Sequence, residues 1–187
     1  MKVLISAVLG GVLMFAWGAA AHMATPLGHM GWKSIPNEAV VLRGLDLAVP
    51  DSGLYMFPGA EPEDMKDPRK AAERAQNIQG GPSGILAVAK KDGATFGAKT
   101  MALEFATNFV CALLIACVLR LGTFSAVGNR ILAGGLIGLF GAVSINGSFW
   151  IWYGFPQDFT LAALVMESVG GLVGAIPPAL MLKGRAA

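Results

Sequence analysis

Two acidic residues, Glu104 and Glu167, stand inside stretches of sequence that are otherwise apolar. Asn108 follows Glu104 by one helical turn, so the two side chains would share a helix face, and Asn146 lies in a third apolar stretch. A charged side chain at the centre of a bilayer costs about 3 kcal/mol or more, so such groups face a bundle interior or a wet cavity. These four residues are our candidates for binding an ion or a proton.

The same side chains also have a purely structural interpretation. The interiors of these stretches hold no Lys or Arg to pair with Glu104 or Glu167, which leaves Asn, Ser, His or water as partners. Hydrogen bonds among protonated carboxyls and such groups would fix how the helices pair, without any ligand. The sequence favours this structural interpretation over the ion-binding one.

A histidine followed by a methionine occurs twice, at and beyond the end of the first apolar stretch, as His22-Met23 and His29-Met30. Imidazole and thioether groups together suit copper, and both also serve as axial ligands of haem. A proline and a glycine between the pairs could turn the chain so that the pairs approach each other. We expect no cofactor, and copper or haem bound by these four residues is the alternative.

Glycines recur at the four-residue spacing that lets membrane helices approach closely. They are Gly134 and Gly138, extended by Gly141, in one apolar stretch, and Gly170 and Gly174 in another. We predict that these faces pack helix against helix within the chain. The alternative is a contact with a second copy of the chain or with another membrane protein.

Four apolar stretches must carry these residues. They cover residues 3–22, 99–120, 131–153 and 159–182. Each is close to the roughly 20 residues that a helix needs to cross the ~30 Å hydrocarbon core of a bilayer. Only 14% of the residues are charged and 55% are apolar, whereas about 25% are charged in soluble domains. The predicted fold class is a membrane all-α protein, a bundle of four transmembrane helices in the lipid bilayer.

Basic residues near the helix ends predict the orientation of the chain. If the chain crosses the membrane four times, one side carries five basic residues that flank the helices: Lys2, Arg120, Arg130, Lys183 and Arg185. By the positive-inside rule that side is the cytoplasm. Both termini are then cytoplasmic, and residues 23–98 lie on the opposite side, which is the periplasm if the membrane is a bacterial inner membrane.

The first apolar stretch also resembles a cleavable signal peptide, with Lys2 before it and small residues near its end. Its length favours a retained helix, because the apolar core of a signal peptide is shorter. Cleavage would leave three helices and would move the mature N-terminus to the outer side.

Residues 23–98 are polar enough for water, and they predict a small α/β cap inserted between the first two membrane helices. The pattern predicts an amphipathic helix over residues 39–47 and a charged helix over 63–76. Short strands are predicted at 54–57 and 85–89. Such a cap could bury little apolar surface alone, so we expect it to depend on the bundle or on a partner.

Four short segments carry a resemblance to known proteins: residues 17–22 (WGAAAH), 26–28 (PLG), 36–38 (PNE) and 53–58 (GLYMFP). Together they resemble a group of small bacterial inner-membrane proteins, over roughly the first third of the chain. The resemblance implies a bacterial inner-membrane setting, and it implies no activity and no site residues.

No motif names a reaction, because the chain lacks GxSxG, HExxH, a Walker loop and a dinucleotide fingerprint. Cys111 and Cys117 share one apolar stretch and form no CxxC site, and a net charge of +2 predicts no nucleic-acid partner. The sequence thus favours a protein without catalytic residues, acting as an accessory or scaffolding subunit of a larger membrane assembly. The alternatives are a small transporter or proton- or cation-binding protein that uses the intramembrane carboxylates, and a copper- or haem-binding membrane protein.

Overall fold

The computed structural model describes residues 1–59, 61–89 and 97–182. Within these residues the chain forms six α-helices, two short 3-10 helices and two strands. The chain divides into two compact units, Met1–Trp32 together with Phe96–Ala187, and Lys33–Thr95. We call the first the helical unit and the second the insert unit.

The helical unit contains four long helices: α1 (Lys2–Ala24), α4 (Ala98–Leu121), α5 (Val127–Tyr153) and α6 (Gln157–Met181). Each is long and apolar enough to cross a membrane, with mean hydropathy between 1.6 and 2.1. The prediction of four such helices is therefore confirmed. α5 begins at Val127 rather than at residue 131, because helical hydrogen bonding continues through the polar residues before the apolar stretch, as in the bond from the Arg130 N–H to the Ala126 carbonyl.

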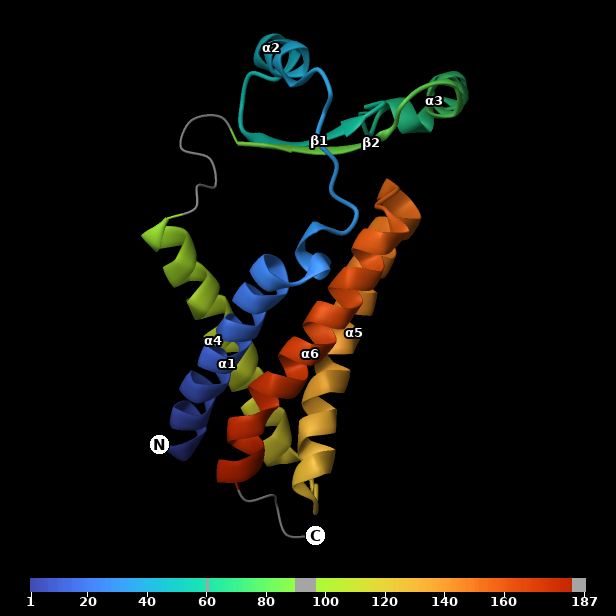
Figure 1. Cartoon of the computed structure of the whole chain (residues 1–187). Helices are drawn as coiled ribbons and strands as arrows, with labels where there is room; N and C mark the ends of the chain where they lie inside the picture. The colour runs from blue at the N-terminus through green and yellow to red at the C-terminus, as the bar shows by residue number, and fades with distance from the viewer. Residues whose placement is uncertain (60, 90–96, 183–187) are drawn as a thin grey trace. The chain divides into compact units, whose positions relative to one another are not determined.

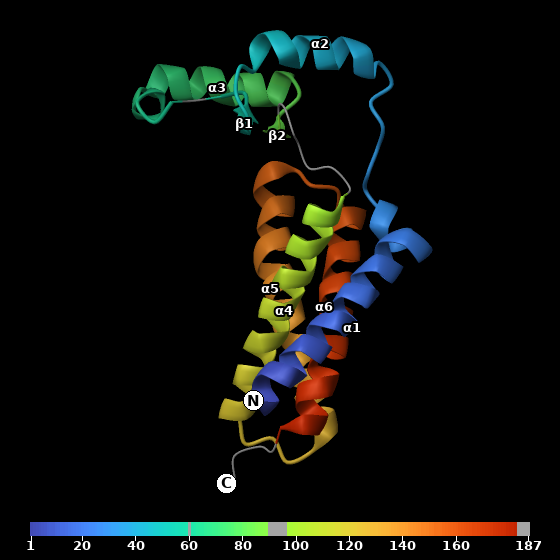
Figure 2. The same cartoon turned by 90° about the vertical axis from the view of Figure 1, so that its left-hand side faces the viewer.

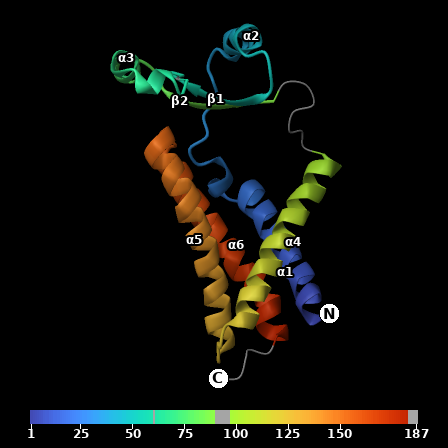
Figure 3. The same ribbon diagram turned by 180° about the vertical axis from the view of Figure 1, so that it is seen from behind.

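The four long helices do not form a closed, evenly packed bundle. α1 packs against both α4 and α6, while α5 packs mainly along α6 (Figures 1 and 2). α4 has little contact with α5, and the two helices diverge from the end where α4 finishes and α5 begins (Figures 1 and 3). α4 therefore packs mainly against α1 rather than against α5.

α5 and α6 approach each other through glycines. A Cβ atom added at Gly134 would lie 2.5 Å from the Gly171 carbonyl oxygen, and one added at Gly138 would overlap the Glu167 carbonyl oxygen. Real side chains do not come this close to a backbone, so the separation of these two helices requires glycine at both positions. Gly141 differs, because a Cβ atom there would meet no atom within 4 Å.

α1 makes a second set of close approaches. A Cβ atom added at Gly10 would lie 2.6 Å from the Gly174 carbonyl oxygen of α6, and one added at Gly11 would lie 2.9 Å from the backbone of α4. Gly170, the other glycine in the predicted α6 pair, is buried and lies near the Trp17 ring of α1. The backbone of α1 thus lies in close contact with the backbones of both α4 and α6.

One arginine joins the end of α6 to the start of α5. The Arg130 guanidinium donates hydrogen bonds to the carbonyls of Ala179, at 3.1 Å, and of Leu182. It also donates to the Phe124 carbonyl in the connection between α4 and α5, at 3.1 Å. Carbonyls at a helix end lack helical donors, so this side chain satisfies groups that would otherwise need water.

The insert unit contains α2 (Glu38–Ala48), β1 (Gly53–Phe57), α3 (Pro68–Gly80) and β2 (Gly84–Val88). β1 and β2 pair in antiparallel register, with Tyr55 opposite Leu86, as a two-stranded sheet. Val49 is the one buried hydrophobic residue among the described residues of this unit. The unit therefore has almost no core, as expected for a chain segment of this size and polarity.

The start of α3 differs from the predicted start at residue 63. The helix begins at Pro68, because the Asp67 carboxylate accepts a hydrogen bond from the Arg69 N–H and a proline suits the first helical position. A short 3-10 helix, Asp64–Lys66, precedes it. The charged sequence before Asp67 has helix propensity but lies outside the capped helix.

Candidate functional site

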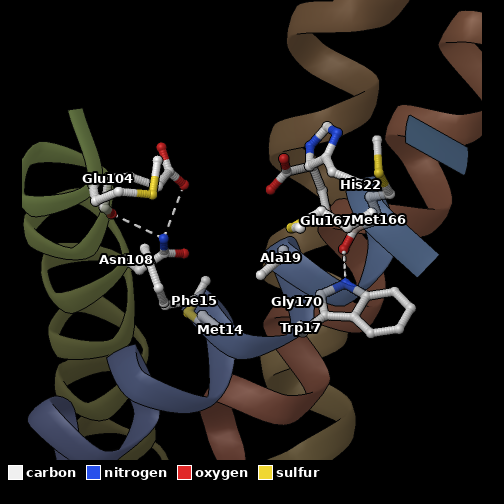
Figure 4. A pocket seen from close by; sticks show the side chains of 13 residues that line it. Met14, Phe15, Trp17, Ala19, His22, Glu104, Asn108, Met166, Glu167 and Gly170 are labelled. Carbon is white, nitrogen blue, oxygen red and sulfur yellow. Dashed lines mark hydrogen bonds between the residues drawn. The ribbon is translucent and has the colours of Figure 1, made fainter. Parts of the chain in front are cut away.

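A cavity of about 350 Å³ opens between α1, α4 and α6, and we call it the α1–α4–α6 cavity. Each helix lines it with residues three or four positions apart, such as Met101, Glu104 and Asn108 of α4. Residues with that spacing share one face of a helix. Side chains that are distant in the sequence therefore face one space, which Figure 4 shows from close by.

The α4 wall of the cavity holds a carboxylate in a defined position. The Asn108 side-chain amide donates to Glu104 Oε1 at 2.9 Å and also to the Glu104 backbone carbonyl at 2.9 Å. The amide thus bridges the side chain and the main chain of the residue one turn earlier. Because both bonds lie within one helix, the predicted pairing of these residues needs no tertiary contact.

The opposite wall brings a second carboxylate and an imidazole together. Figure 4 shows Glu167 of α6 beside His22 at the end of α1, with Glu104 across the cavity from both. Among the described residues that line the cavity, none is Lys or Arg. The carboxyl groups of Glu104 and Glu167 therefore share a space without a fixed basic partner other than the imidazole.

An aromatic side chain is fixed at the junction of α1 and α6. The Trp17 indole N–H donates to the Met166 backbone carbonyl at 2.9 Å, which fixes its position between the two helices, and Trp17 is among the residues that line the cavity (Figure 4). Phe15 also lines the cavity and meets Phe105 of α4 edge to face, with ring centroids 6.2 Å apart. The aromatic part of the lining is thus positioned by contacts between helices.

Methionines form much of the remaining lining, and sequence reasoning singled out only one of them. The lining methionines are Met14, Met23, Met101 and Met166. A methionine in an apolar stretch looks like any lipid-facing or packing residue, so its type carries no functional signal. The available signal was spacing, because Met101 lies three positions before Glu104 and Met166 directly precedes Glu167.

Asn146 lies apart from the other candidates for ion binding. Its side-chain amide donates to the Ala142 carbonyl of its own helix, α5, at 3.2 Å, and it is not among the residues that line the α1–α4–α6 cavity. The cavity is bounded by α1, α4 and α6, whereas α5 packs on the far side of α6. Glu104, Asn108 and Glu167 are brought together, and Asn146 is not.

The two predicted histidine–methionine pairs have different surroundings. His22 and Met23 line the α1–α4–α6 cavity, whereas His29 and Met30 do not. The chain does fold back here, because a Cβ atom at Gly28 would lie 2.5 Å from the His22 Cα. In the part of the chain that the structure describes, no group of three or more His, Cys, Asp or Glu residues is arranged to hold a metal ion. Copper or haem binding by the four residues stays a prediction.

The lining of the cavity has the chemistry of a site for a positively charged ligand. Two carboxyl groups face it from opposite walls (Figure 4), and aromatic and methionine side chains are among the other residues that line it. A cation or a proton between such walls relieves the repulsion between the two carboxylates. A scan against protein-family models and searches of curated proteins and of solved structures found no match to this chain.

Proposed function

We propose that this chain is a small transporter or binding protein of a membrane, which takes up a cation in exchange for protons at Glu104 and Glu167. The observation that carries the proposal is that both carboxyl groups reach one cavity, from α4 and from α6. A purely structural network would bond the two acids to neighbouring helices. Instead, the side-chain amide that holds Glu104 comes from its own helix.

The exchange of a cation for protons follows from the number of charges in the cavity. Two carboxylates in a space of low polarity repel each other, so the empty site favours binding at least one proton. A bound cation supplies the same compensation and displaces that proton. The two ligands therefore compete, which is the requirement for coupling the movement of one to the other.

The proposed setting is a bacterial inner membrane, with both termini in the cytoplasm and residues 23–98 in the periplasm. Lys2, Arg120 and Arg130 support this orientation, because they lie at the ends of α1, α4 and α5 that gather on one side of the helical unit (Figure 1). Large apolar side chains such as Phe140, 76% exposed, and Trp152, 78% exposed, support solvation by lipid. The cavity then lies in the half of the membrane away from the basic residues.

We also propose that α1 is retained as a transmembrane helix and is not a cleaved signal peptide. Gly10 and Gly11 bring its backbone against α6 and α4, and Trp17 donates a hydrogen bond to α6. α1 also supplies His22 and one wall of the cavity. Removal of this helix would open the site completely on one side.

The test is proton flux through the reconstituted protein. The full chain is placed in liposomes with a trapped pH-sensitive dye, a proton gradient is imposed, and sodium, potassium, magnesium and organic ammonium salts are added in turn. At least one cation should dissipate the gradient through the wild-type chain. The double variant Glu104→Gln with Glu167→Gln should lose this flux.

Glu73→Gln, which removes one carboxylate from α3 in the insert unit, is the matched control and should keep the wild-type flux. Equal flux in wild-type protein and in the double variant would contradict the proposal. The absence of any cation-dependent signal from wild-type protein that is folded and correctly inserted would contradict transport, and the proposal would then require cation binding with proton release in detergent.

A second candidate function is that of an accessory or scaffolding subunit. It is favoured by the divergence of α4 from α5, since these two helices pack little against each other within the described residues (Figure 3). A membrane-protein partner or a second copy of the chain could pack against the side of α4 that faces α5. Purification from native membranes in mild detergent tests this, because a lone monomer would argue against it and a co-purifying subunit would support it.

A further inference from the structure

We infer that the α1–α4–α6 cavity takes an organic cation, namely an ammonium compound with an apolar or aromatic body. This inference rests on the proposed function, since it names the class of cation that the carboxyl groups of Glu104 and Glu167 would bind. It follows from the volume of the cavity, from the aromatic and methionine side chains that line it, and from the lack of a metal-binding cluster among the described residues.

The size of the cavity suits a small molecule rather than a bare ion. Its volume of about 350 Å³ lies at the lower end of the range of roughly 300–1,000 Å³ that is typical of small-molecule sites. A dehydrated metal ion needs a close shell of ligands and leaves no such space. A ligand with several carbon atoms would fill it.

Aromatic rings in the lining favour a positive charge that carries carbon substituents. Trp17 is held in place by its hydrogen bond to the Met166 carbonyl, and Phe15 by its edge contact with Phe105. A cation near the face of such a ring is attracted by the ring electrons, and quaternary ammonium groups are bound in this way. Because these rings are fixed before binding, little ordering is required when the ligand enters.

Methionine side chains provide an adaptable apolar surface on the rest of the lining. Met14 and Met23 come from α1, Met101 from α4 and Met166 from α6, so every wall of the cavity carries at least one. Thioether side chains are flexible and polarisable, and they are common on surfaces that accept ligands of varied shape. The cavity therefore suits a class of related cations rather than one rigid compound.

Inorganic cations fit the lining less well. Mg²⁺ and Ca²⁺ require six or more oxygen ligands at short distance, whereas the carboxyl groups here stand on facing walls among apolar groups (Figure 4). Within the described residues no set of three acidic, histidine or cysteine side chains is placed to hold a metal ion. A quaternary ammonium ion needs no directional ligands, so two carboxylates at a distance are sufficient to hold it.

The experiment compares a cation with its uncharged copy. Benzyltrimethylammonium and neopentylbenzene have the same shape, because a carbon atom replaces the nitrogen in the second compound. Each is titrated into the full chain in mild detergent, and binding is followed by calorimetry together with the release of protons into a weakly buffered solution. The cation should bind with proton release. The hydrocarbon should bind at least tenfold more weakly, which is a difference of about 1.4 kcal/mol in binding free energy.

Variants separate the contribution of charge from that of the aromatic wall. Glu104→Gln and Glu167→Gln should each weaken binding of the cation by roughly tenfold or more, and Glu73→Gln should not change it. Trp17→Leu should weaken it by roughly three- to tenfold through loss of the ring. Trp152→Leu, at a position 78% exposed on α5 and outside the cavity, is the matched control.

The possible results distinguish this inference from the proposed function. Equal affinity for both compounds would overturn the inference, because the cavity would then be an apolar site that ignores charge. Binding of sodium, magnesium or Cu⁺ with proton release that depends on Glu104 and Glu167, but no binding of the ammonium compound, would overturn the inference and leave the proposed function standing. No proton release with any cation would overturn both.

Discussion

At the scale of single residues, the position of Glu104 depends on one neighbouring amide. Asn108 donates to the Glu104 carboxylate and to its backbone carbonyl, and both acceptors belong to α4. Asn146 has a similar bond to its own helix but is not part of the cavity lining. The two asparagines thus have the same local chemistry and different surroundings, so they can be compared directly.

We predict that Asn108→Ala weakens binding of benzyltrimethylammonium by roughly three- to tenfold, because the Glu104 carboxylate loses the hydrogen-bond donor that orients it. Stability should change by less than about 1 kcal/mol, since alanine favours the helix and the lost bond is partly open to the cavity. Calorimetric titration and thermal unfolding in detergent measure the two effects. Asn146→Ala should leave affinity unchanged, and an equal loss in both variants would rule out a specific role for Asn108.

At the scale of elements, the position of Glu167 depends on how closely α5 approaches α6. Gly138 lies against the Glu167 carbonyl oxygen, so the backbone that carries this acid is in contact with α5. α5 does not line the α1–α4–α6 cavity, yet it supports the helix that does. Gly141 lies one turn further along α5 and faces open space, since nothing lies within 4 Å of a Cβ atom placed there.

We predict that Gly138→Ala lowers the stability of the helical unit by about 1–3 kcal/mol, because the added methyl group overlaps the Glu167 carbonyl and forces the helices apart. The displacement of α6 should also weaken cation binding and slow the coupled proton flux. Thermal unfolding in detergent and the liposome assay measure these effects.

The same substitution one turn away is the control. Gly141→Ala should be neutral or stabilising by up to about 1 kcal/mol, because alanine is the better helix former and the site has room for it. If both alanine variants were equally stable and active, the close contact between α5 and α6 would not be what positions Glu167.

At the scale of the whole molecule, the cavity has a function in cation uptake only if the helices cross a membrane in one orientation. Ser83 lies in the connection between α3 and β2, and Ser125 lies in the connection between α4 and α5. Both residues are exposed in their own unit. The proposed orientation places them on opposite sides of the membrane.

We predict that Ser83→Cys reacts with a membrane-impermeant maleimide in intact spheroplasts, whereas Ser125→Cys reacts only after lysis. The native thiols are first removed by Cys111→Ala and Cys117→Ala, and labelling is read as a mass shift on a gel. This difference follows from the exclusion of the charged reagent by the bilayer. The opposite pattern would reverse the proposed orientation, and labelling of both positions before lysis would contradict the membrane topology.

Local and periodic features could be predicted from the order of residues. The four apolar helices and the pairing of Glu104 with Asn108 are of this kind, since hydrogen bonding along one helix sets the spacing of its side chains. Element boundaries were less accurate, as at α3, where the cap at Asp67 rather than the charge pattern decides the start. The short strands could be predicted because the turn residues that bound them, such as Pro58 and Gly84, are also local.

Which helices meet, and on which faces, was decided by the tertiary structure alone. Glu104 and Glu167 face one cavity because α1 packs against both α4 and α6 through close backbone contacts, and these depend on shape rather than on any periodic pattern. The same packing excludes Asn146 and brings in Met14, although neither outcome is visible in residue type. Residue type alone does not identify such contacts, because lipid solvates every apolar face almost equally and only the fit between particular surfaces selects a partner.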